Sequence, residues 1–419
     1  MATITDVAER HLCTGCGACA YVQPDDITMV DDLDAGRRPL VREGTTSSRA
    51  LAACPGAELE HPPTHPPGAI EELLGAWGPV LGVWEGHALD PEVRRSASSG
   101  GIASALALHC MEAEAMHGVL HIRQRADAAL LNETTLSTTR EELLAATGSR
   151  YAPASPCDGL QMVVDAPGEC VMIGKPCDVA ATRRVRDADP ALDAKLGFTI
   201  AMFCAGTPST RGTMELVRRL GLELGDVRSV RYRGNGWPGD FVVVAGDGEH
   251  EQVRSLSYAE SWNFLQRYRQ WRCSLCADHT GEFADVAVGD PWYRETTPDQ
   301  LGSSLILARS PRGRDVLLRA AEAGAIQLRP LAPSRLVDAQ PNLLATRGAV
   351  WGRVLVSRAG GVVPPRYRRI PTFGTWWSHL PPKAKVRSLT GTARRLVSKR
   401  LYRRRPVVAA TVRSGEPLA

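Results

Sequence analysis

The alternation of apolar and polar positions predicts an α/β fold over most of this chain. Short runs of branched apolar residues recur between stretches in which apolar residues are spaced by three or four positions, as in a helix. The predicted strands are residues 118–122, 169–174, 198–203, 284–290 and 326–328, and the predicted helices are residues 102–108, 178–184, 211–220 and 315–323. Strands that alternate with helices are typical of a sheet covered by helices.

Three further segments have patterns of their own. Residues 27–30 and 39–41 are predicted as two short strands that flank a turn. Residues 225–246 predict a β-rich excursion whose Gly-rich turn carries a Trp, Trp237, that looks exposed; the simpler interpretation is a hairpin with a packed aromatic. Residues 386–405 place apolar side chains at helical intervals among Arg and Lys, which predicts a basic amphipathic helix.

These patterns divide the chain into three parts. Residues 1–62 are predicted to form a small N-terminal module, residues 70–352 a mixed α/β body, and residues 353–419 a basic tail that contains Pro and Trp. The Pro-rich residues 61–68 are typical of a linker. A length of 419 residues is sufficient for two or three domains with a sizeable core.

The composition is that of an ordinary soluble globular protein, with 43% hydrophobic and 23% charged residues. No apolar run approaches the length of a membrane span, and the first residues lack the basic and apolar pattern of a signal peptide. Eleven cysteines in such a chain favour metal ligands over disulfides. We therefore expect a cytoplasmic protein.

Charge is distributed unevenly along the chain. The formal net charge is +4, yet residues 361–419 carry 14 Lys and Arg against the single acid Glu416, which leaves 36 basic and 45 acidic residues before them. A basic tail on an acidic body suggests an anionic contact for the tail. Peripheral membrane association or an acidic partner fits the helix predicted at residues 386–405; a helix packed on the body with a solvated basic face is the alternative. Nucleic acid is not expected, because no nucleic-acid-binding module accompanies the charge.

The cysteine spacing predicts an iron–sulfur cluster near the N-terminus. Cys13, Cys16 and Cys19 are each separated by two residues, and the distant Cys54 is followed by Pro. This is the ligand arrangement of a ferredoxin-type [4Fe-4S] cluster, and the glycines between the cysteines allow a tight turn. A zinc knuckle and a group of unrelated buried thiols are the alternatives. One cluster is expected here, because no second triplet lies near Cys54.

The order of the strands suggests a second set of four cysteines. Cys177 and Cys204 are each predicted to lie in a loop just past the end of a strand, where open α/β sheets place their ligand sites. Cys273 and Cys276 form a C-x-x-C pair further along. From the residues alone, the first two can also be structural thiols, and the pair can be a redox pair or half of a zinc site. The remaining cysteines are predicted to be core residues: Cys110, Cys157 and Cys170.

A loop rich in Ser and Gly, residues 96–101, leads into the helix predicted at residues 102–108. Free N–H groups and the positive end of the helix dipole at such a terminus suit a phosphate group. An ordinary helix capped by Ser98 or Ser99 explains the same residues.

Seven segments, taken in order, resemble the coenzyme F420 hydrogenase/dehydrogenase beta-subunit family. They are residues 96–101 (SASSGG), 148–151 (GSRY), 173–177 (IGKPC), 203–206 (FCAG), 232–239 (YRGNGWPG), 273–276 (CSLC) and 284–290 (ADVAVGD). The resemblance spans roughly residues 90 to 350 and excludes the basic tail. Arg150 stands where the family pattern leads us to expect Lys, and Arg and Lys are not interchangeable at a tight site.

The resemblance implies FAD and a [4Fe-4S] cluster in the α/β body. Members with an added N-terminal ferredoxin-like module, such as plant 7-hydroxymethyl chlorophyll a reductase, carry a second cluster. By this resemblance, Cys177, Cys204, Cys273 and Cys276 hold the body cluster. The residues implied to contact FAD are Ser96, Ser98, Ser99, Gly100, Gly101, Ser149, Arg150, Tyr151 and Lys175.

We therefore expect an iron–sulfur flavoprotein oxidoreductase. It would move electrons between reduced coenzyme F420 or ferredoxin and a small-molecule substrate, through FAD and two [4Fe-4S] clusters. Two alternatives remain open: an electron-input subunit of a larger redox complex, which requires a partner subunit, and a redox-sensing interaction protein. No Ser/His/Asp set or pair of carboxylates indicates a hydrolytic site.

Overall fold

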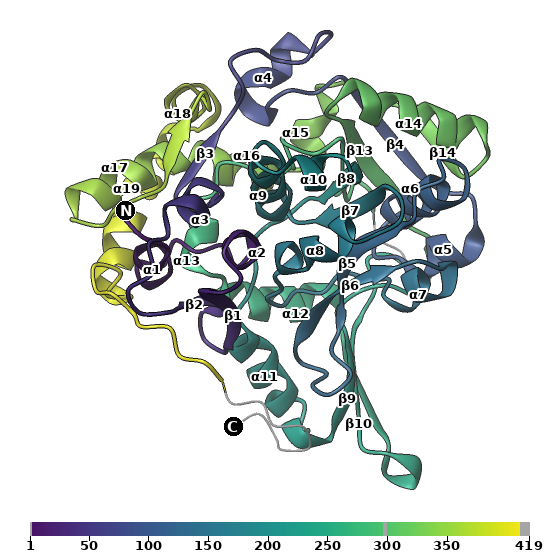
Figure 1. The fold of residues 1–419 in the computed structure, drawn as a ribbon, viewed down its shortest axis with the longest axis horizontal. Helices are drawn as coiled ribbons and strands as arrows, with labels where there is room; N and C mark the ends of the chain where they lie inside the picture. The colour runs from purple at the N-terminus through teal and green to yellow at the C-terminus, as the bar shows by residue number, and fades with distance from the viewer. Residues whose placement is uncertain (1, 296–299, 411–419) are drawn as a thin grey trace.

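A mixed sheet of eight strands lies at the centre of the molecule, for which the computed structural model describes residues 2–295 and 300–410 (Figure 1). The strand order is β14-β4-β13-β12-β8-β7-β5-β6. The four strands β12, β8, β7 and β5 are mutually parallel, and every other pairing is antiparallel. The bounds are β4 (Gly82–Ala88), β5 (Gly118–Gln124), β6 (Asn132–Ser137), β7 (Cys170–Gly174), β8 (Leu196–Met202), β12 (Val286–Gly289), β13 (Ser304–Ala308) and β14 (Ile326–Pro330).

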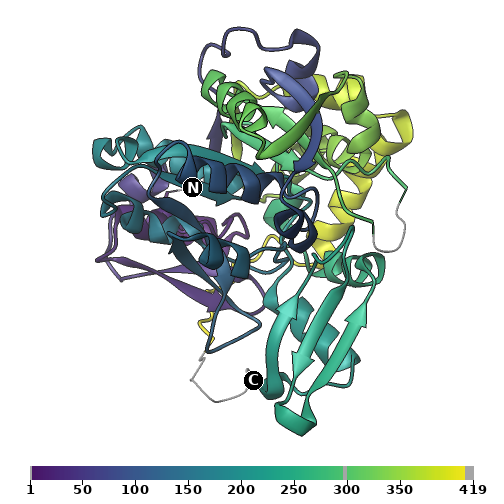
Figure 2. The ribbon, with the colours of Figure 1, turned by 90° about the vertical axis from the view of Figure 1, so that its right-hand side faces the viewer.

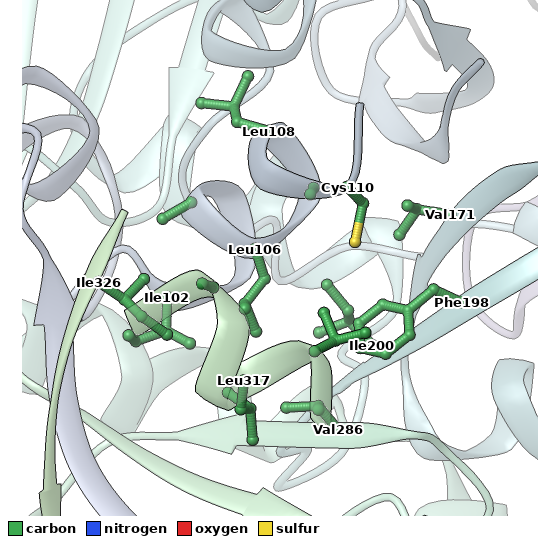
Figure 3. Close-up of a cluster of buried hydrophobic side chains, with 14 of the residues drawn as sticks. Ile102, Leu106, Leu108, Cys110, Val171, Phe198, Ile200, Val286, Leu317 and Ile326 are labelled. Atoms are coloured by element: carbon green, nitrogen blue, oxygen red, sulfur yellow. The ribbon is translucent and has the colours of Figure 1, made fainter. Parts of the chain in front are cut away.

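Helices cover both faces of this sheet, which explains why its parallel strands are apolar almost throughout. On one face, Leu106 and Leu317 pack with Phe198 and the neighbouring strands (Figure 3). On the other face, Leu160 packs with Met172. The covering helices are α6 (Ile102–Glu112) and α14 (Pro311–Glu322) on the first face, and α8 (Leu160–Val164), α9 (Pro176–Arg186) and α10 (Pro190–Asp193) on the second.

Shorter helices connect these layers. The α-helical ones are α4 (Glu71–Trp77), α5 (Pro91–Ser96), α7 (Arg140–Ala145), α13 (Trp271–Ser274), α15 (Arg335–Ala339) and α16 (Pro341–Gly348). The 3-10 turns are η1 (Pro156–Gly159), η2 (Leu224–Asp226), η3 (Gly248–His250) and η4 (Gln266–Tyr268). The mixed α/β character of the body, predicted from the sequence, is confirmed by the sheet.

The N-terminal module contains three short helices and a hairpin. Its elements are α1 (Ile4–Glu9), α2 (Ala18–Val22), β1 (Ile27–Asp32), β2 (Gly36–Val41), α3 (Ser48–Ala52) and β3 (Glu58–Glu60). β1 and β2 pair antiparallel, which confirms the two strands predicted there. α2 packs against η1 and α9 of the body, so the module is joined to the second face of the sheet.

A three-stranded antiparallel sheet projects from the body (Figures 1 and 2). It consists of β9 (Val227–Arg231), β10 (Phe241–Ala245) and β11 (Gln252–Leu256), and it packs on α11 (Thr210–Arg219) and α12 (Tyr258–Leu265). The prediction of a hairpin missed β11, because β11 lies beyond the segment that showed the pattern. Trp237, which looks exposed in the sequence, is 3% exposed and therefore a packed aromatic.

The C-terminal residues fold along one outer edge of the molecule (Figure 1). They form α17 (Val350–Ala359), β15 (Arg366–Arg368), α18 (Thr372–His379) and α19 (Pro382–Ser398). The helix predicted at residues 386–405 therefore begins and ends earlier than expected. Leu396 and Leu401 are buried in the same hydrophobic cluster as Val7 and Leu12 of the N-terminal module, so α19 packs on the rest of the protein. Residues 411–419 of the predicted tail lie outside the described residues.

The contact between tail and N-terminal module includes a strand pairing and several ion pairs. β15 pairs in parallel with β3. Further along, Arg405 donates two hydrogen bonds to Asp32, and Arg404 is paired with Asp6 and Glu9. Part of the anionic partner predicted for the tail therefore lies within the same chain. Within the described residues, no helix combines the length and the apolar character that a membrane crossing requires.

Candidate active site

A cavity of about 280 Å³ opens beside the carboxyl ends of β7, β8 and β12. This is the edge of a parallel sheet at which ligands bind in open α/β folds. Of the residues predicted to contact FAD, seven line the cavity: Ser98, Ser99, Gly101, Ser149, Arg150, Tyr151 and Lys175. Ser96, the last residue of α5, and Gly100, in the loop that follows, are not among the lining residues.

The Ser/Gly loop is fixed by one hydrogen bond to Ser98 and one from Ser99. Ser98 Oγ accepts a hydrogen bond from the backbone N–H of Ser149, and Ser99 Oγ donates to the carbonyl of Ser303 over 2.8 Å. Neither serine caps α6, so the expected Ser cap is wrong. The N-cap is Gly101, with φ of 79°, a left-handed conformation that favours glycine. The first turn of α6 therefore lines the cavity without a side-chain cap on its N–H groups.

Arg150 and Lys175, two of the cations in the cavity wall, have different surroundings. Arg150 is held by the protein itself, because its guanidinium donates to the carbonyls of Val230 and Ala129 over 2.8 Å and 3.0 Å. Lys175 forms a partly buried ion pair with Asp178 over 2.7 Å. Burial by itself lowers the pKa of Lys175, but the neighbouring Asp178 carboxylate outweighs it and raises that pKa, so Lys175 is an ammonium at neutral pH.

An aromatic and charged wall that sequence reasoning did not assign completes the cavity. Arg233, which is 2% exposed, forms a bidentate pair with Asp290 at 2.8 Å and 2.9 Å. Its guanidinium lies 4.9 Å from the ring centre of Tyr258, which stacks on Trp292 at 5.2 Å. Trp237 donates its indole N–H to Asp290 over 2.8 Å. Arg233 and Asp290 both lie within segments that carry the family resemblance, which was the available signal; Tyr258 and Trp292 had none.

The first cysteine set surrounds a small cavity of its own. Cys13, Cys16, Cys19 and Cys54 all line it, together with apolar residues, Gly17 and Thr14. Gly17 has φ of 93°, and a Cβ on it would lie 2.7 Å from the backbone N of Asp158. The Gly15 N–H donates to Cys13 Sγ over 3.3 Å. Burial raises the pKa of the Cys54 thiol to about 12.

The second cysteine set adjoins the main cavity. Cys177 lies in the first turn of α9 rather than in a loop as predicted, and Cys204 follows β8 and lines the main cavity. Cys177 lies close enough to Cys204 and Cys276 to interact electrostatically with both, and Cys204 with Cys273. The Thr207 N–H donates to Cys273 Sγ over 3.4 Å. Burial raises the pKa of Cys204 and of Cys276 to about 12.

The ligand roles of these eight cysteines stay a prediction. In the described ranges, 2–295 and 300–410, no group of three or more His, Cys, Asp or Glu side chains is placed to hold a metal ion. The donor chemistry nevertheless suits iron–sulfur clusters, whose ligands are thiolates and whose sulfurs accept backbone N–H bonds. Both sets provide four cysteine sulfurs and a backbone N–H that donates to one of them. The other three thiols, Cys110, Cys157 and Cys170, are fully buried, as predicted.

One short turn contacts both cysteine sets. The Cys157 N–H in η1 donates to the carbonyl of Cys16 over 2.9 Å, and Cys157 Sγ donates to the carbonyl of Asp178, next to Cys177, over 3.3 Å. Ser155 Oγ donates to the carbonyl of Gly15 over 2.7 Å. This turn therefore connects the backbone beside one cysteine set to the backbone beside the other.

Comparison with known proteins decides the family. Models of the coenzyme F420 hydrogenase/dehydrogenase beta subunit match residues 83–161, with its N-terminal part, and residues 168–334, with its C-terminal part. The chain belongs to this family. The two matches together cover more than half of the chain. The N-terminal cysteine set and the basic tail lie outside them.

Curated relatives and a solved structure agree with this membership. The beta subunit of coenzyme F420 hydrogenase from Methanococcus voltae is 26% identical over 270 residues, which is 61% of this chain and 85% of the relative. The corresponding subunit from Methanosarcina barkeri is 24% identical over 252 residues, 58% of this chain and 79% of the relative. A chain of the F420-reducing [NiFe] hydrogenase complex from Methanosarcina barkeri has the same fold, with a TM-score of 0.53 and 20% identity over 68% of this chain and 96% of that one.

Proposed function

We propose that this chain is the flavin-containing electron-transfer subunit of a redox complex, acting between coenzyme F420 and a partner subunit through FAD and two [4Fe-4S] clusters. The observation that carries the proposal is the cavity whose wall includes the Ser/Gly loop, Lys175 and Cys204. Bound FAD supplies the exchange between a hydride and single electrons. Curated relatives named as hydrogenase beta subunits support a role within a complex.

The cavity residues fit a flavin nucleotide. The first turn of α6 offers N–H groups to a phosphate. Gly100 allows the loop to lie against the sheet, because a Cβ there would approach the carbonyl O of Gly86 to 2.7 Å. The stacked Tyr258 and Trp292 offer a flat surface to a planar ring, and the Lys175 ammonium is a fixed positive charge at the wall.

The order of the sites supports a path for electrons away from the cavity. Cys204 belongs to the cavity wall and to the second cysteine set, so that set would accept electrons from the flavin. The turn around Cys157 then leads to the first set. The N-terminal module would therefore be the site of exchange with a ferredoxin or a partner subunit.

A self-contained oxidoreductase with its own small-molecule substrate is the second candidate. It is favoured by one observation: the chain carries an additional cysteine set outside the family matches, held on the body by the tail. A subunit of a complex requires a stable partner for turnover, whereas a self-contained enzyme does not. Anaerobic purification from the native source separates the two by whether a second polypeptide co-elutes in constant ratio.

Anaerobic purification with measurement of iron, sulfide and flavin, followed by mixing with reduced coenzyme F420, tests the proposal. We expect about eight irons and one FAD per chain, with rapid loss of the oxidised-flavin absorbance. Cys204→Ser and Cys54→Ser should each remove about four irons, and Cys110→Ala, at a buried thiol of neither set, should remove none. About four irons and no flavin in the unmodified protein would refute the proposed function.

A further inference from the structure

Large apolar side chains are exposed where α18 and α19 meet. Phe373, Trp377 and Val386 are 51%, 64% and 59% exposed. The rings of Phe373 and Trp377 stack at 6.2 Å, and Lys385 Nζ lies 4.7 Å from the centre of the Trp377 ring, next to Val386 in the chain. We call these three apolar residues the aromatic edge. Such a group of exposed apolar side chains marks an interaction site.

The aromatic edge is surrounded by positive charge. Lys383, Lys385 and Arg387 are within four residues of Val386, and residues 361–410 contain no acidic residue. In the part of the chain that the structure describes, neither Lys383 nor Arg387 forms an ion pair, in contrast to Arg404 and Arg405, which the N-terminal module neutralises. The surface thus combines exposed aromatic rings with cations whose charge the protein leaves uncompensated.

The opposite side of α19 packs against the rest of the protein. Ser388, Thr392 and Leu396 are buried, and α19 packs along α17. The orientation of the exposed side is therefore fixed before any partner arrives, and α17, α18 and α19 lie together at an outer edge of the molecule (Figure 1). A rigid, outward-facing helix with apolar and basic residues on its exposed side has the properties of an interfacial helix.

We propose that the aromatic edge docks this protein on an anionic lipid bilayer. Phe373, Trp377 and Val386 would enter the boundary between head groups and acyl chains, where Trp and other aromatic rings are favoured. Lys383, Lys385 and Arg387 would contact lipid phosphates, which complement their charge. Docking at this edge goes beyond the proposed redox function and does not depend on it. Exposed aromatic rings beside uncompensated cations match the two layers of an anionic bilayer surface, the head-group boundary and the lipid phosphates.

Co-sedimentation of the complete, cofactor-loaded protein with vesicles tests the proposal. We expect binding to vesicles of phosphatidylcholine with phosphatidylglycerol and little binding to phosphatidylcholine alone. The triple variant Lys383→Gln, Lys385→Gln, Arg387→Gln should lower the affinity for anionic vesicles by about a hundredfold, since each cation near the surface contributes about 1 kcal/mol. The double variant Phe373→Ala, Trp377→Ala should lower it by about tenfold or more.

A matched control uses an exposed apolar and basic pair elsewhere. Val253, 53% exposed on β11, and the adjacent Arg254 lie on the projecting sheet; Val253→Ala, Arg254→Gln should bind as the unmodified protein does. Flavin content and thermal unfolding of each variant identify any that misfold. Equal losses in the control and the edge variants, or binding by the triple variant at full affinity, would overturn the proposal. Retention of the unmodified protein on polyglutamate but not on anionic vesicles would overturn it in favour of an acidic protein partner.

Discussion

At the scale of single residues, the buried imidazole of His61 joins the linker to the body. His61 Nε2 donates to Glu282 over 2.7 Å, and Arg347 contacts the other oxygen of that carboxylate. Burial lowers the pKa of His61, the nearby guanidinium of Arg347 acts in the same direction, and the resulting pKa is about 4. The guanidinium of Arg347 compensates the negative charge of the Glu282 carboxylate. The imidazole of His61 is therefore neutral in the folded protein at pH 7.

The neutral state of His61 makes stability depend on pH. Between the ordinary pKa of about 6.5 and the folded value of about 4, the unfolded chain binds a proton that the folded protein does not. The free energy of unfolding therefore falls as pH falls through this window, by about 2 kcal/mol between pH 7 and pH 5. Denaturant unfolding of His61→Gln should show a smaller decrease than the unmodified protein.

The exposed His65, four residues along the same linker, provides the control for this measurement. His65→Gln should keep the full decrease between pH 7 and pH 5. A decrease that is the same in all three proteins would show that His61 is not the group that titrates.

At the scale of elements, Gly100 determines where the Ser/Gly loop lies and therefore the shape of the cavity wall. Gly100 N–H donates to Ser304 Oγ, and the Gly100 carbonyl accepts from Ala88, so the loop is bonded to both β13 and β4. A Cβ at Gly100 would lie 2.7 Å from Gly86 O and 2.7 Å from Ser304 N, which are backbone atoms that cannot move independently.

Gly100→Ala should therefore displace the loop and weaken flavin binding. Overpacking of this kind costs about 1–3 kcal/mol, which corresponds to a loss of roughly one to two orders of magnitude in FAD affinity if the loop alone absorbs it. Reconstitution of the flavin-free protein with FAD, followed by fluorescence, measures the change. Gly75→Ala in α4, where the added Cβ meets no atom within 4 Å, should leave the affinity unchanged.

Sequence pattern predicted the elements whose signal is local. Apolar spacing predicted five strands of the central sheet, β5, β7, β8, β12 and β14, and the helices α6, α9, α11 and α14, whereas the strands β4, β6 and β13 were not predicted. The position of Cys177 within α9 and the Gly101 cap of α6 were missed, because helix ends depend on which backbone conformation the surrounding loop imposes. β11 was missed because its side chains are mostly exposed and lack the alternation of a half-buried strand.

The site was predicted only in part. The residues that were missed come together from positions far apart in the sequence. The loop at residues 96–101 and the segment at residues 148–151 were recognised as motifs, and the cavity brings them together. Tyr258 and Trp292 stack through the tertiary fold, so no local pattern marks them. The partner of Arg233, Asp290, is 57 residues away in sequence.

At the scale of the whole molecule, the tail holds the N-terminal module against the body. Arg405 donates to both carboxylate oxygens of Asp32, and the Val408 N–H donates to the same carboxylate. Burial raises the pKa of Asp32, but the hydrogen bonds from Arg405 and Val408 outweigh it, and the net pKa is below its ordinary value. This stabilisation is present above the ordinary carboxyl pKa and is lost as pH falls toward the lower folded value.

Arg405→Gln should release this part of the tail without disturbing the body. Asp32 would lose its charged partner, and the amides of residues 405–410 should exchange with deuterium faster at pH 7, as mass spectrometry detects. Arg403→Gln, at an exposed neighbour that forms no ion pair among the described residues, is the control. Equal exchange rates in the two variants would show that the Asp32 contact does not hold the tail.

The pairing of β15 with β3 has a consequence for how the protein is made. β3 ends at residue 60, and its partner strand begins at residue 366, so a ribosome has synthesised most of the chain before the two strands can meet. During that time, the first four cysteines form part of a module that lacks its last strand and the packing of Leu396 and Leu401. Contacts this distant in sequence form late in folding. The module that is synthesised first is therefore completed last. Its thiols are enclosed only after the C-terminal residues have been synthesised and have packed on it.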